Sequence, residues 1–443
     1  MTMPDFPEAS RETLAARRRR VFDQLGDGVM VLPATPVQYS SRDNERPYAS
    51  DRELFYLTGL TEPETVAVLV GGDEPRLVLF VRERDPDAEL WAGPRLGPAG
   101  AEERVRPDAC HPLPEMPDVL PGLLGGGDRL YYRFDRRDAV KDSVLQALAT
   151  ARSRGARRGT GPRGVIDPGE ILDELRLRKD ATELEAIRRA CAITVGGHQA
   201  AAGAIRPGAG EWAVEAALEA AFRSAGATGP AFATIVGSGD NACVLHYVRN
   251  ADTISDGDLV LVDAGAEAGC YCGDVTRTYP ASGSFSPRQR RIYDLVDGAR
   301  KAAIAATRPG ATIRSVHDAA VRTMVEGLRE MGVLSGNVDD LVEEGAHAAF
   351  FPHQTSHWLG LDVHDPGDYA RAGEPRVLEP GMVFTVEPGL YFARDTENDV
   401  AREYAGIGVR IEDDVAVTAD GCEVLTSSLP TSAADVEALV AGV

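Results

Sequence analysis

The sequence predicts a chain of two domains that both combine helices with strands, the second of them built on an internal repeat. Three observations carry this prediction. The chain has 443 residues, which is enough for two or three domains. Short apolar runs separated by turn residues occupy its first third. A helix-helix-strand pattern then occurs twice in the remainder.

The composition excludes several classes of function. The chain carries 47 basic and 69 acidic side chains, so its net charge is −22 at pH 7. A protein this acidic repels the phosphates of nucleic acids and the headgroups of anionic membranes. No apolar run reaches the roughly 18 residues that a membrane span requires. We therefore expect neither nucleic acid nor membrane among its partners.

The cysteines and the N-terminus indicate a cytoplasmic protein. The six cysteines are sparse and irregularly spaced, so they predict no disulfide framework. The first ten residues lack the charged and apolar regions of a secretory signal. Cys270 and Cys272 form a Cys-x-Cys motif, but no second cysteine pair is present to complete a metal site. We expect them to be small strand residues of a core.

The first domain is expected to begin with a helix and to continue with strands. An apolar stripe of helical spacing at residues 14–25 predicts the helix, and it leaves Arg17 to Arg20 on a solvated face. Short apolar runs bounded by turns predict strands at residues 28–32, 65–70 and 77–81. This alternation of helix and strands is what an α/β domain requires.

The domain boundary is expected between residues 165 and 180. Residues 151–163 are basic and glycine-rich without apolar periodicity, which indicates an exposed connector. Asp180 and Glu183 then have the spacing of a capping box at the start of a helix. An apolar stripe of helical spacing follows at Leu184, Ile187, Cys191 and Val195. We therefore divide the chain into domains of residues 1–172 and 173–443.

Two segments of the second domain share one order of elements. A helical stretch ends in Ile-Arg-Pro-Gly-Ala at residues 205–209, and another ends in Thr-Arg-Pro-Gly-Ala at residues 307–311. In each segment a second helix follows, and then an apolar strand. Asp263 and Glu387 end these two strands, each six residues after a glycine. A duplicated unit predicts that the two carboxylates face the same place.

A second carboxylate is expected beside Asp263. If Ala268 and Gly269 form the turn of a hairpin, Asp274 lies opposite Asp263 with their β-carbons about 5 Å apart. Two opposed carboxylates repel each other, so they need a shared proton or a cation. A proton-sharing pair resembles aspartic proteases, whose matching Asp-Thr-Gly loops are missing here. A pair of divalent metal ions is the better explanation.

Further candidate ligands are histidines. His353, His357 and His364 lie within twelve residues, in a chain that has eight histidines. A loop of hydrogen-bonded histidines is the alternative interpretation. The spacing of the first two imitates the zinc-protease motif His-Glu-x-x-His. That interpretation fails because Gln354 replaces the general-base glutamate and Pro352 is unsuited to a helix interior.

Two more acids lie in apolar surroundings. Glu387 ends the run Val-Phe-Thr-Val, and Glu412 follows Val-Arg-Ile, so both are expected to be partly buried and to need partners. Together with Asp263, Asp274 and His357 they match the ligand count of two metals about 3.5 Å apart. Manganese suits carboxylate and imidazole ligands, and zinc or cobalt could bind as well.

These blocks resemble a known family. GSGDNACVLHY, LVDAGAEAGCYCGDVTRT, TSHWLGLDVHD, TVEPGLYF and GIGVRIEDD are similar to the signature blocks of the aminopeptidase P family of pita-bread metallopeptidases. SSRDNERPYASDRELFYLTGLTEPE and LWAGPRLGP are similar to its N-terminal blocks. The resemblance implies an α/β N-terminal domain for oligomerisation and substrate gating. It also implies an α+β pita-bread catalytic domain with a pseudo-two-fold internal repeat. The implied activity is that of a Xaa-Pro aminopeptidase, which releases the N-terminal residue that precedes proline.

The resemblance implies roles for the ligands. Asp263 is expected to bind one metal, Asp274 and Glu412 to bridge both, and His357 and Glu387 to complete the other. The nucleophile is expected to be a water activated by the metals. Glu387 is also expected to move its proton to the departing proline nitrogen.

The resemblance implies further roles around the metals. His246 and His364 are expected to hydrogen-bond the substrate and stabilise the oxyanion. His353, Tyr391 and Arg410 are expected to contact substrate or ligands. Trp91 is expected on a loop that caps a neighbouring subunit's site, although the sequence alone allows a buried core position. The family has Gly where this chain has Gln354, which affects the expected position of His353 and the shape of the proline pocket.

Several alternatives remain at this point. A prolidase, which cleaves only Xaa-Pro dipeptides, shares every ligand, but the N-terminal blocks favour an aminopeptidase. Metal-free relatives that bind peptides or histones, and a creatinase-like hydrolase, lack the ligands that this chain keeps. Similar sites can also act on phosphotriesters, but the sequence gives no reason to expect this as the main role. The expected partners are peptides with proline at the second position and further copies of the chain in a homodimer or homotetramer.

Overall fold

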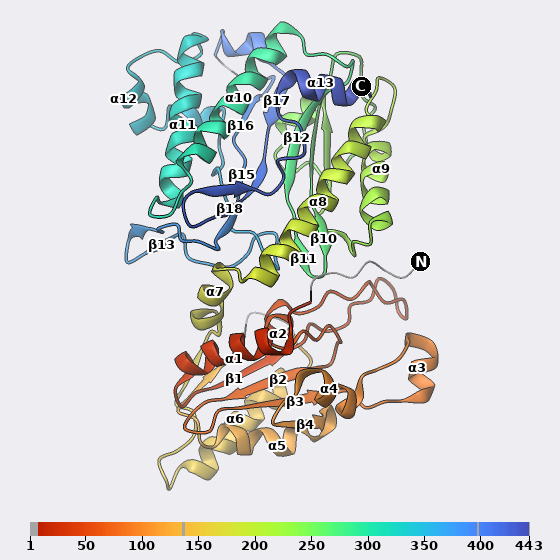
Figure 1. Ribbon diagram of the computed structural model, residues 1–443, viewed down its shortest axis with the longest axis vertical. Coiled ribbons are helices and arrows are strands. Elements are labelled where there is room, and N and C mark those ends of the chain that lie inside the picture. Colours follow the sequence, from red (N-terminus) through yellow and green to blue (C-terminus); the bar gives the residue numbers. More distant parts are fainter. Residues whose placement is uncertain (1–7, 135–137, 397, 443) are drawn as a thin grey trace. The chain divides into compact units, whose positions relative to one another are not determined.

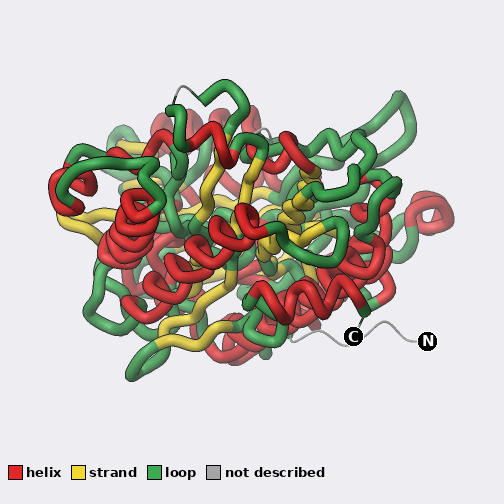
Figure 2. The backbone as a smooth tube through the Cα atoms, turned by 90° about the horizontal axis from the view of Figure 1, so that it is seen from above, coloured by secondary structure: helices red, strands yellow, loops and turns green. Residues whose placement is uncertain are grey.

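Two compact units make up the protein. A computed structural model describes residues 8–134, 138–396 and 398–442, and it divides into Glu8–Leu175 and a second unit that begins at Arg176. Figure 1 labels the elements, and Figure 2 shows how helices and strands alternate with loops along the backbone. None of the helices in these ranges combines the length and apolar character that a membrane crossing needs.

The first unit is an α/β layer structure around one mixed sheet. The strand order is β4-β3-β2-β1-β5-β6, and β2 is antiparallel to both of its neighbours, β3 and β1. Figure 1 shows α1 and α2 on one face of this sheet and α5 and α6 on the other. The strands are β1 (Val29–Pro33), β2 (Val66–Val70), β3 (Arg76–Val81), β4 (Ala109–Pro112), β5 (Arg129–Tyr131) and β6 (Gly164–Ile166). The helices are α1 (Arg11–Leu25), α2 (Arg52–Thr58), α3 (Pro86–Ala92), α4 (Gly97–Val105), α5 (Met116–Leu124), α6 (Lys141–Gly155) and α7 (Gly169–Leu177), whose last two residues belong to the second unit.

The expected helix and three strands of this unit are present as α1, β1, β2 and β3. The expectation that Arg17 to Arg20 are solvated is wrong for two of them. Arg17 and Arg18 are buried and donate to the backbone carbonyls of Tyr56 and Leu57 at the end of α2. Cations placed at the C-terminal end of a helix satisfy carbonyls that have no partner inside that helix.

The prediction of an exposed connector at residues 151–163 is wrong for residues 151–155. Residues 151–155 form the last turn and a half of α6, and Ala151 and Gly155 are buried. The chain folds back so tightly here that a β-carbon on Gly155 would lie 2.2 Å from the Thr160 carbonyl oxygen. Glycine is therefore required at this position by a close backbone approach.

The second unit contains helix pairs and short sheets. Figure 1 shows α8 beside β10–β12 and α10 beside β16 and β17, with α9 packed on α8 and α11 packed on α10. Its sheets have the orders β12-β9-β8, β11-β10-β7, β15-β18-β19, β16-β17 and β13-β14. The helices are α8 (Ala181–Ala204), α9 (Glu211–Ser224), α10 (Pro287–Ala306), α11 (Ile313–Glu330), α12 (Val338–Glu343) and α13 (Ala433–Ala441). The strands are β7 (Gly229–Pro230), β8 (Ile235–Ser238), β9 (Leu259–Ala264), β10 (Ala266–Ala268), β11 (Tyr271–Cys272), β12 (Val275–Pro280), β13 (Ala370–Arg371), β14 (Glu374–Pro375), β15 (Val383–Val386), β16 (Gly389–Phe392), β17 (Ile407–Arg410), β18 (Asp413–Val417) and β19 (Cys422–Val424).

The expected internal repeat is visible in matched backbone hydrogen bonds. After α8 the Gly208 N–H donates to the Ile254 carbonyl at 2.8 Å, and after α10 the Gly310 N–H donates to the Leu378 carbonyl at 3.0 Å. Both glycines have left-handed φ angles, 85° and 83°. The same turn therefore ties each helix pair to the segment before its apolar strand, which is β9 in one copy and β15 in the other.

The hairpin that carries two of the acids has a different register from the expected one. Asp263 pairs with Thr276 rather than with Asp274, because the turn is centred on Gly269 and Cys270. Both turn residues have positive φ, 59° and 69°, as a two-residue type I′ turn requires. Asp274 lies two residues from Thr276, so it is a diagonal neighbour of Asp263 on the same face. Cys270 thus belongs to the turn and not to a strand, whereas Cys272 is buried in β11.

Candidate metal centre

The five expected ligands come from both copies of the repeat. Asp263 lies on β9 and Asp274 directly precedes β12. His357 lies in a loop that precedes β15 in the chain and runs beside it, where the Thr385 N–H donates to the His357 carbonyl at 3.0 Å. Glu387 directly follows β15, and Glu412 lies between β17 and β18.

Three of these side chains form a tight group. Asp274, His357 and Glu412 each offer one ligand atom, and these atoms all lie within 4.8 Å of one another. Glu387 joins the group because its Oε1 is 3.5 Å from His357 Nε2, which also lies 3.3 Å from Asp274 Oδ2. Asp263 stands at the edge of the group, where its Oδ2 accepts a hydrogen bond of 2.6 Å from Arg410.

Burial of these acids opposes their negative charge. It raises the pKa of Asp274 to about 6 and that of Glu387 to about 7, and it raises the pKa of Glu412 well above its usual value. Burial alone lowers the pKa of His357, but its hydrogen bond with Asp274 and the charge of Glu387 raise it to about 9. A cation among the acids relieves the same repulsion and desolvation.

Two carboxylate oxygens indicate where such a cation binds. The Oδ1 atoms of Asp263 and Asp274 are buried and accept no hydrogen bond from any part of the chain that the structure describes. A buried carboxylate oxygen without a donor is costly, and a metal ion satisfies it. Carboxylate oxygens with one imidazole suit manganese, zinc and similar divalent ions. The donor set therefore fits a divalent metal.

A chain of hydrogen bonds runs from Asp263 to the wall of the site. Arg410 also donates to the Tyr391 hydroxyl at 2.9 Å, and that hydroxyl lies 2.8 Å from His353 Nε2. Because Arg410 can only donate, the Tyr391 proton is left for His353 Nε2, and His353 Nδ1–H donates to the Gln354 carbonyl at 2.9 Å. Burial lowers the pKa of His353 to about 3, which agrees with this neutral form.

An open cavity of about 450 Å³ lies over the acids. All five expected ligands line it, together with His246, His364, His353 and Arg410. Its apolar wall consists of Phe232, Ala233, Ile235, Leu245, Val248 and Val363. His246 and His364 are exposed at this cavity, and the ring of His364 lies 4.2 Å from that of His357 between centroids. The arrangement offers a small apolar pocket beside several hydrogen-bonding groups.

Trp91 lies in the other unit of the protein. It is part of α3, not of a loop as expected, and 88% of its surface is exposed. The core position that the sequence also allowed is therefore wrong. Its expected role at a neighbouring subunit stays a prediction.

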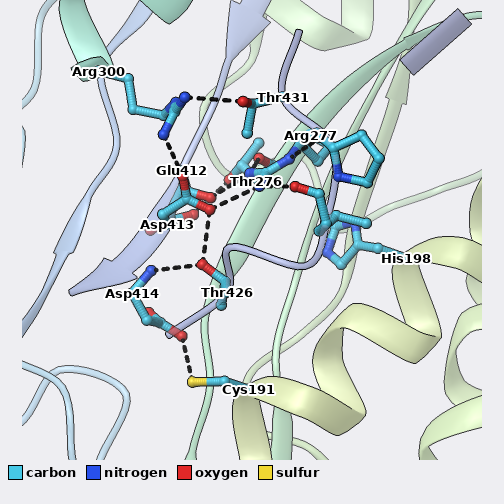
Figure 3. Close-up of polar contacts among 12 residues, drawn as sticks. Cys191, His198, Thr276, Arg277, Arg300, Glu412, Asp413, Asp414, Thr426 and Thr431 are labelled. Carbon is cyan, nitrogen blue, oxygen red and sulfur yellow. Dashed lines mark hydrogen bonds and ion pairs between the residues drawn. The ribbon is translucent and has the colours of Figure 1, made fainter. Parts of the chain in front are cut away.

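Several polar residues behind the acids were not found by sequence reasoning. The Thr276 hydroxyl contacts Glu412, and Asp414 Oδ2 accepts hydrogen bonds from the Asp274 N–H and the Cys191 thiol. Figure 3 shows the contact of Cys191 with Asp414 together with the buried ion pairs that link Asp413 to Arg277 and Arg300. The string of acids at 412–414 was a possible signal, because three acids inside an apolar strand need buried partners.

Comparisons with known proteins show which families the chain resembles. Residues 185–419 match the metallopeptidase family M24, and residues 14–131 match the aminopeptidase P, N-terminal domain family. The chain is 42% identical over 440 residues to the Xaa-Pro aminopeptidase of Escherichia coli, an alignment that covers 98% of each chain.

Solved structures are similar over the same length. Aminopeptidase PepP of Pseudomonas aeruginosa matches with a TM-score of 0.94 and 44% identity, covering 99% of each chain. A zinc-substituted aminopeptidase P of Escherichia coli in complex with product matches with a TM-score of 0.93 and 41% identity. That match covers 98% of this chain and 99% of the other.

Proposed function

The chain belongs to metallopeptidase family M24, and from this membership and the geometry of the acidic site we infer that it is a Xaa-Pro aminopeptidase. It hydrolyses the peptide bond before a proline in the second position and releases the N-terminal residue. The family resemblance and the two-domain pita-bread fold expected from the sequence are thereby confirmed. The observation that carries the proposal is the group of Asp274, His357 and Glu412, whose ligand atoms meet at the base of an open cavity.

The protein binds divalent metal ions, as members of its family do, and we propose that this group holds them because its donors suit such ions. We propose that two manganese ions bind, because carboxylates dominate the donor set. Asp263, Asp274, His357, Glu387 and Glu412 would hold these ions. When bound, the ions lower the pKa of a water and polarise the carbonyl of the scissile bond.

The side chains around the cavity supply the remaining chemistry. Glu387 holds a proton at its carboxylate and passes it to the proline nitrogen that leaves. His246 and His364 are exposed at the cavity and donate hydrogen bonds where negative charge develops on the carbonyl oxygen. Arg410 holds Asp263 in place, and Tyr391 holds His353 against the cavity wall. Each of these roles is a proposal for this chain.

Proline specificity follows from the shape of the bond. The amide before proline has no N–H, so a site that recognises that N–H loses its contact. The apolar wall and the neutral ring of His353 offer a surface on which the proline ring packs. Gln354, which stands where the family has Gly, is exposed and lines the same cavity, so it contributes to the shape of this pocket.

The proposed activity is tested with two peptides. We expect the manganese-loaded protein to release arginine from Arg-Pro-Pro with a higher kcat/KM than it releases alanine from Ala-Pro. Release of the N-terminal residue is followed by mass spectrometry, and Arg-Ala-Pro serves as the control without proline in the second position. Cleavage of Ala-Pro alone would instead identify a prolidase, and cleavage of Arg-Ala-Pro at an equal rate would remove the proline specificity.

The partners, the oligomeric state and the cellular location of the enzyme are further proposals. The partners are peptides with proline in the second position. We propose that residues 1–172 serve oligomerisation and substrate gating in a homodimer or homotetramer, with the exposed Trp91 at a neighbouring subunit. We also propose a cytoplasmic location, in keeping with six cysteines that are all free thiols.

A further inference from the structure

Thr276 connects two of the groups that hold the acidic site together. It lies on β12 and is fully buried. Its Oγ1 donates to Glu412 Oε2 at 2.6 Å and accepts from Arg410 Nε at 3.1 Å. Figure 3 shows Thr276 next to the carboxylate of Glu412.

The direction of these hydrogen bonds is fixed by chemistry. A guanidinium can only donate, so Arg410 must donate to Thr276 Oγ1. The single hydroxyl proton of Thr276 is then available only for the carboxylate of Glu412. The 2.6 Å distance lies in the short range of O–H···O⁻ hydrogen bonds, and the ionised carboxylate is the form of Glu412 that would bind a metal. The rotamer and the proton of Thr276 are therefore both determined.

Thr276 also ties the two copies of the repeat to each other. Its backbone carbonyl accepts from the Glu412 N–H at 3.0 Å, so both the main chain and the side chain of Glu412 contact it. Arg410, which its hydroxyl orients, donates to Asp263 Oδ2 at 2.6 Å. Asp263 is in turn the backbone partner of Thr276 across β9 and β12. One hydroxyl thus links an acid of the first copy to an acid of the second.

We propose that Thr276 is a positioning residue that sets the separation and orientation of the Asp263 and Glu412 carboxylates, and through them the affinity for divalent metal. This inference rests on the proposed metal-dependent function. A carboxylate that binds a metal is oriented by the hydrogen bonds that its other lone pairs accept. A residue that donates such a hydrogen bond changes the affinity for the metal without contacting the ion.

The test is a substitution of equal shape. Thr276→Val replaces the hydroxyl with a methyl group, so it leaves Glu412 Oε2 without this donor and Arg410 Nε without this acceptor. Thr276→Ser keeps the hydroxyl and removes only a methyl group. We expect Thr276→Val to bind Mn²⁺ about 10–100-fold more weakly than the unchanged protein, and Thr276→Ser to restore the affinity to within about threefold.

A matched control lies two residues away on the same strand. Thr278 is equally buried, and its Oγ1 contacts only the backbone N–H and carbonyl of Arg410 among the described residues, at 3.2 and 3.0 Å. Thr278→Val removes a buried hydroxyl from the same strand without touching a carboxylate. We expect this variant to lose thermal stability and to keep its Mn²⁺ affinity.

The affinities are measured by chelator-buffered Mn²⁺ titration in the absence of peptide, together with the Tm of each metal-free protein. Weaker binding by Thr276→Val alone supports the proposal. Unchanged binding by Thr276→Val overturns it, as does an equal loss in Thr278→Val or a failure of Thr276→Ser to restore affinity. If the unchanged protein binds no Mn²⁺, Zn²⁺ or Co²⁺, the proposed function itself is overturned and this inference with it.

Discussion

Asp274→Asn is expected to abolish metal-dependent peptide hydrolysis while the fold is retained. The neutral amide is a poor ligand, and it replaces the acid whose Oδ1 is buried without a donor among the described residues and whose Oδ2 lies 3.3 Å from His357. Loss of a residue that only hydrogen-bonds to a metal ligand already lowers metal affinity or activity about 10–100-fold. Loss of a ligand itself is therefore expected to lower the activity further. The measurement is kcat/KM on Arg-Pro-Pro at saturating Mn²⁺.

The same variant has a second expected result. Burial and the charge of Asp263 both raise the pKa of Asp274, so its carboxylate opposes folding when no metal is present. We expect the metal-free Tm of Asp274→Asn to equal or exceed that of the unchanged protein. The control is Asp294→Asn, because Asp294 forms an exposed pair with Arg290 on α10. Full activity in Asp274→Asn would refute its assignment as a ligand.

Arg277→Met is expected to cause the largest loss of stability. Arg277 is fully buried, and its guanidinium donates to Asp413 Oδ1 at 2.7 Å and to the backbone carbonyls of Thr276 and Glu412. Its removal leaves Asp413 buried with Arg300 as its remaining ion-pair partner. Breaking a buried ion pair in this way costs about 3–5 kcal/mol. The free energy of unfolding is therefore expected to fall by this amount.

Denaturant unfolding of the metal-free proteins measures this loss. The control is Arg290→Met, which removes an exposed arginine from its pair with Asp294 and is expected to cost less than about 1 kcal/mol. If Arg277→Met lowers the free energy of unfolding by no more than this control does, the ion pair of Arg277 with Asp413 does not stabilise the fold.

Sequence patterns located the acids because each acid interrupts an apolar strand. Asp263 and Glu387 end strands of a repeat whose glycine turns are also repeated, and this regularity is visible without coordinates. The hairpin register was wrong because Cys270 adopts a left-handed φ of 69°, which residues other than glycine rarely do. The register shift was two residues, so Asp274 stayed on the same face as Asp263.

Partners that are distant along the chain could not be predicted. Arg17 is buried because the end of α2, 39 residues away, offers it a carbonyl. Thr276 meets Glu412 across 136 residues, and a threonine in a strand is otherwise an ordinary residue. Such contacts depend on the packing of separate elements, and local periodicity carries no information about them.

The central claim is that one pair of divalent ions binds among five side chains from both halves of the repeat. It is tested most directly by anomalous diffraction at the manganese absorption edge from crystals of the Mn²⁺-loaded protein. The account predicts two peaks about 3.5 Å apart. The peaks are expected among Asp263, Asp274, His357, Glu387 and Glu412. A crystal of active protein with no peak among these residues, or with its peaks elsewhere in the chain, would contradict the account.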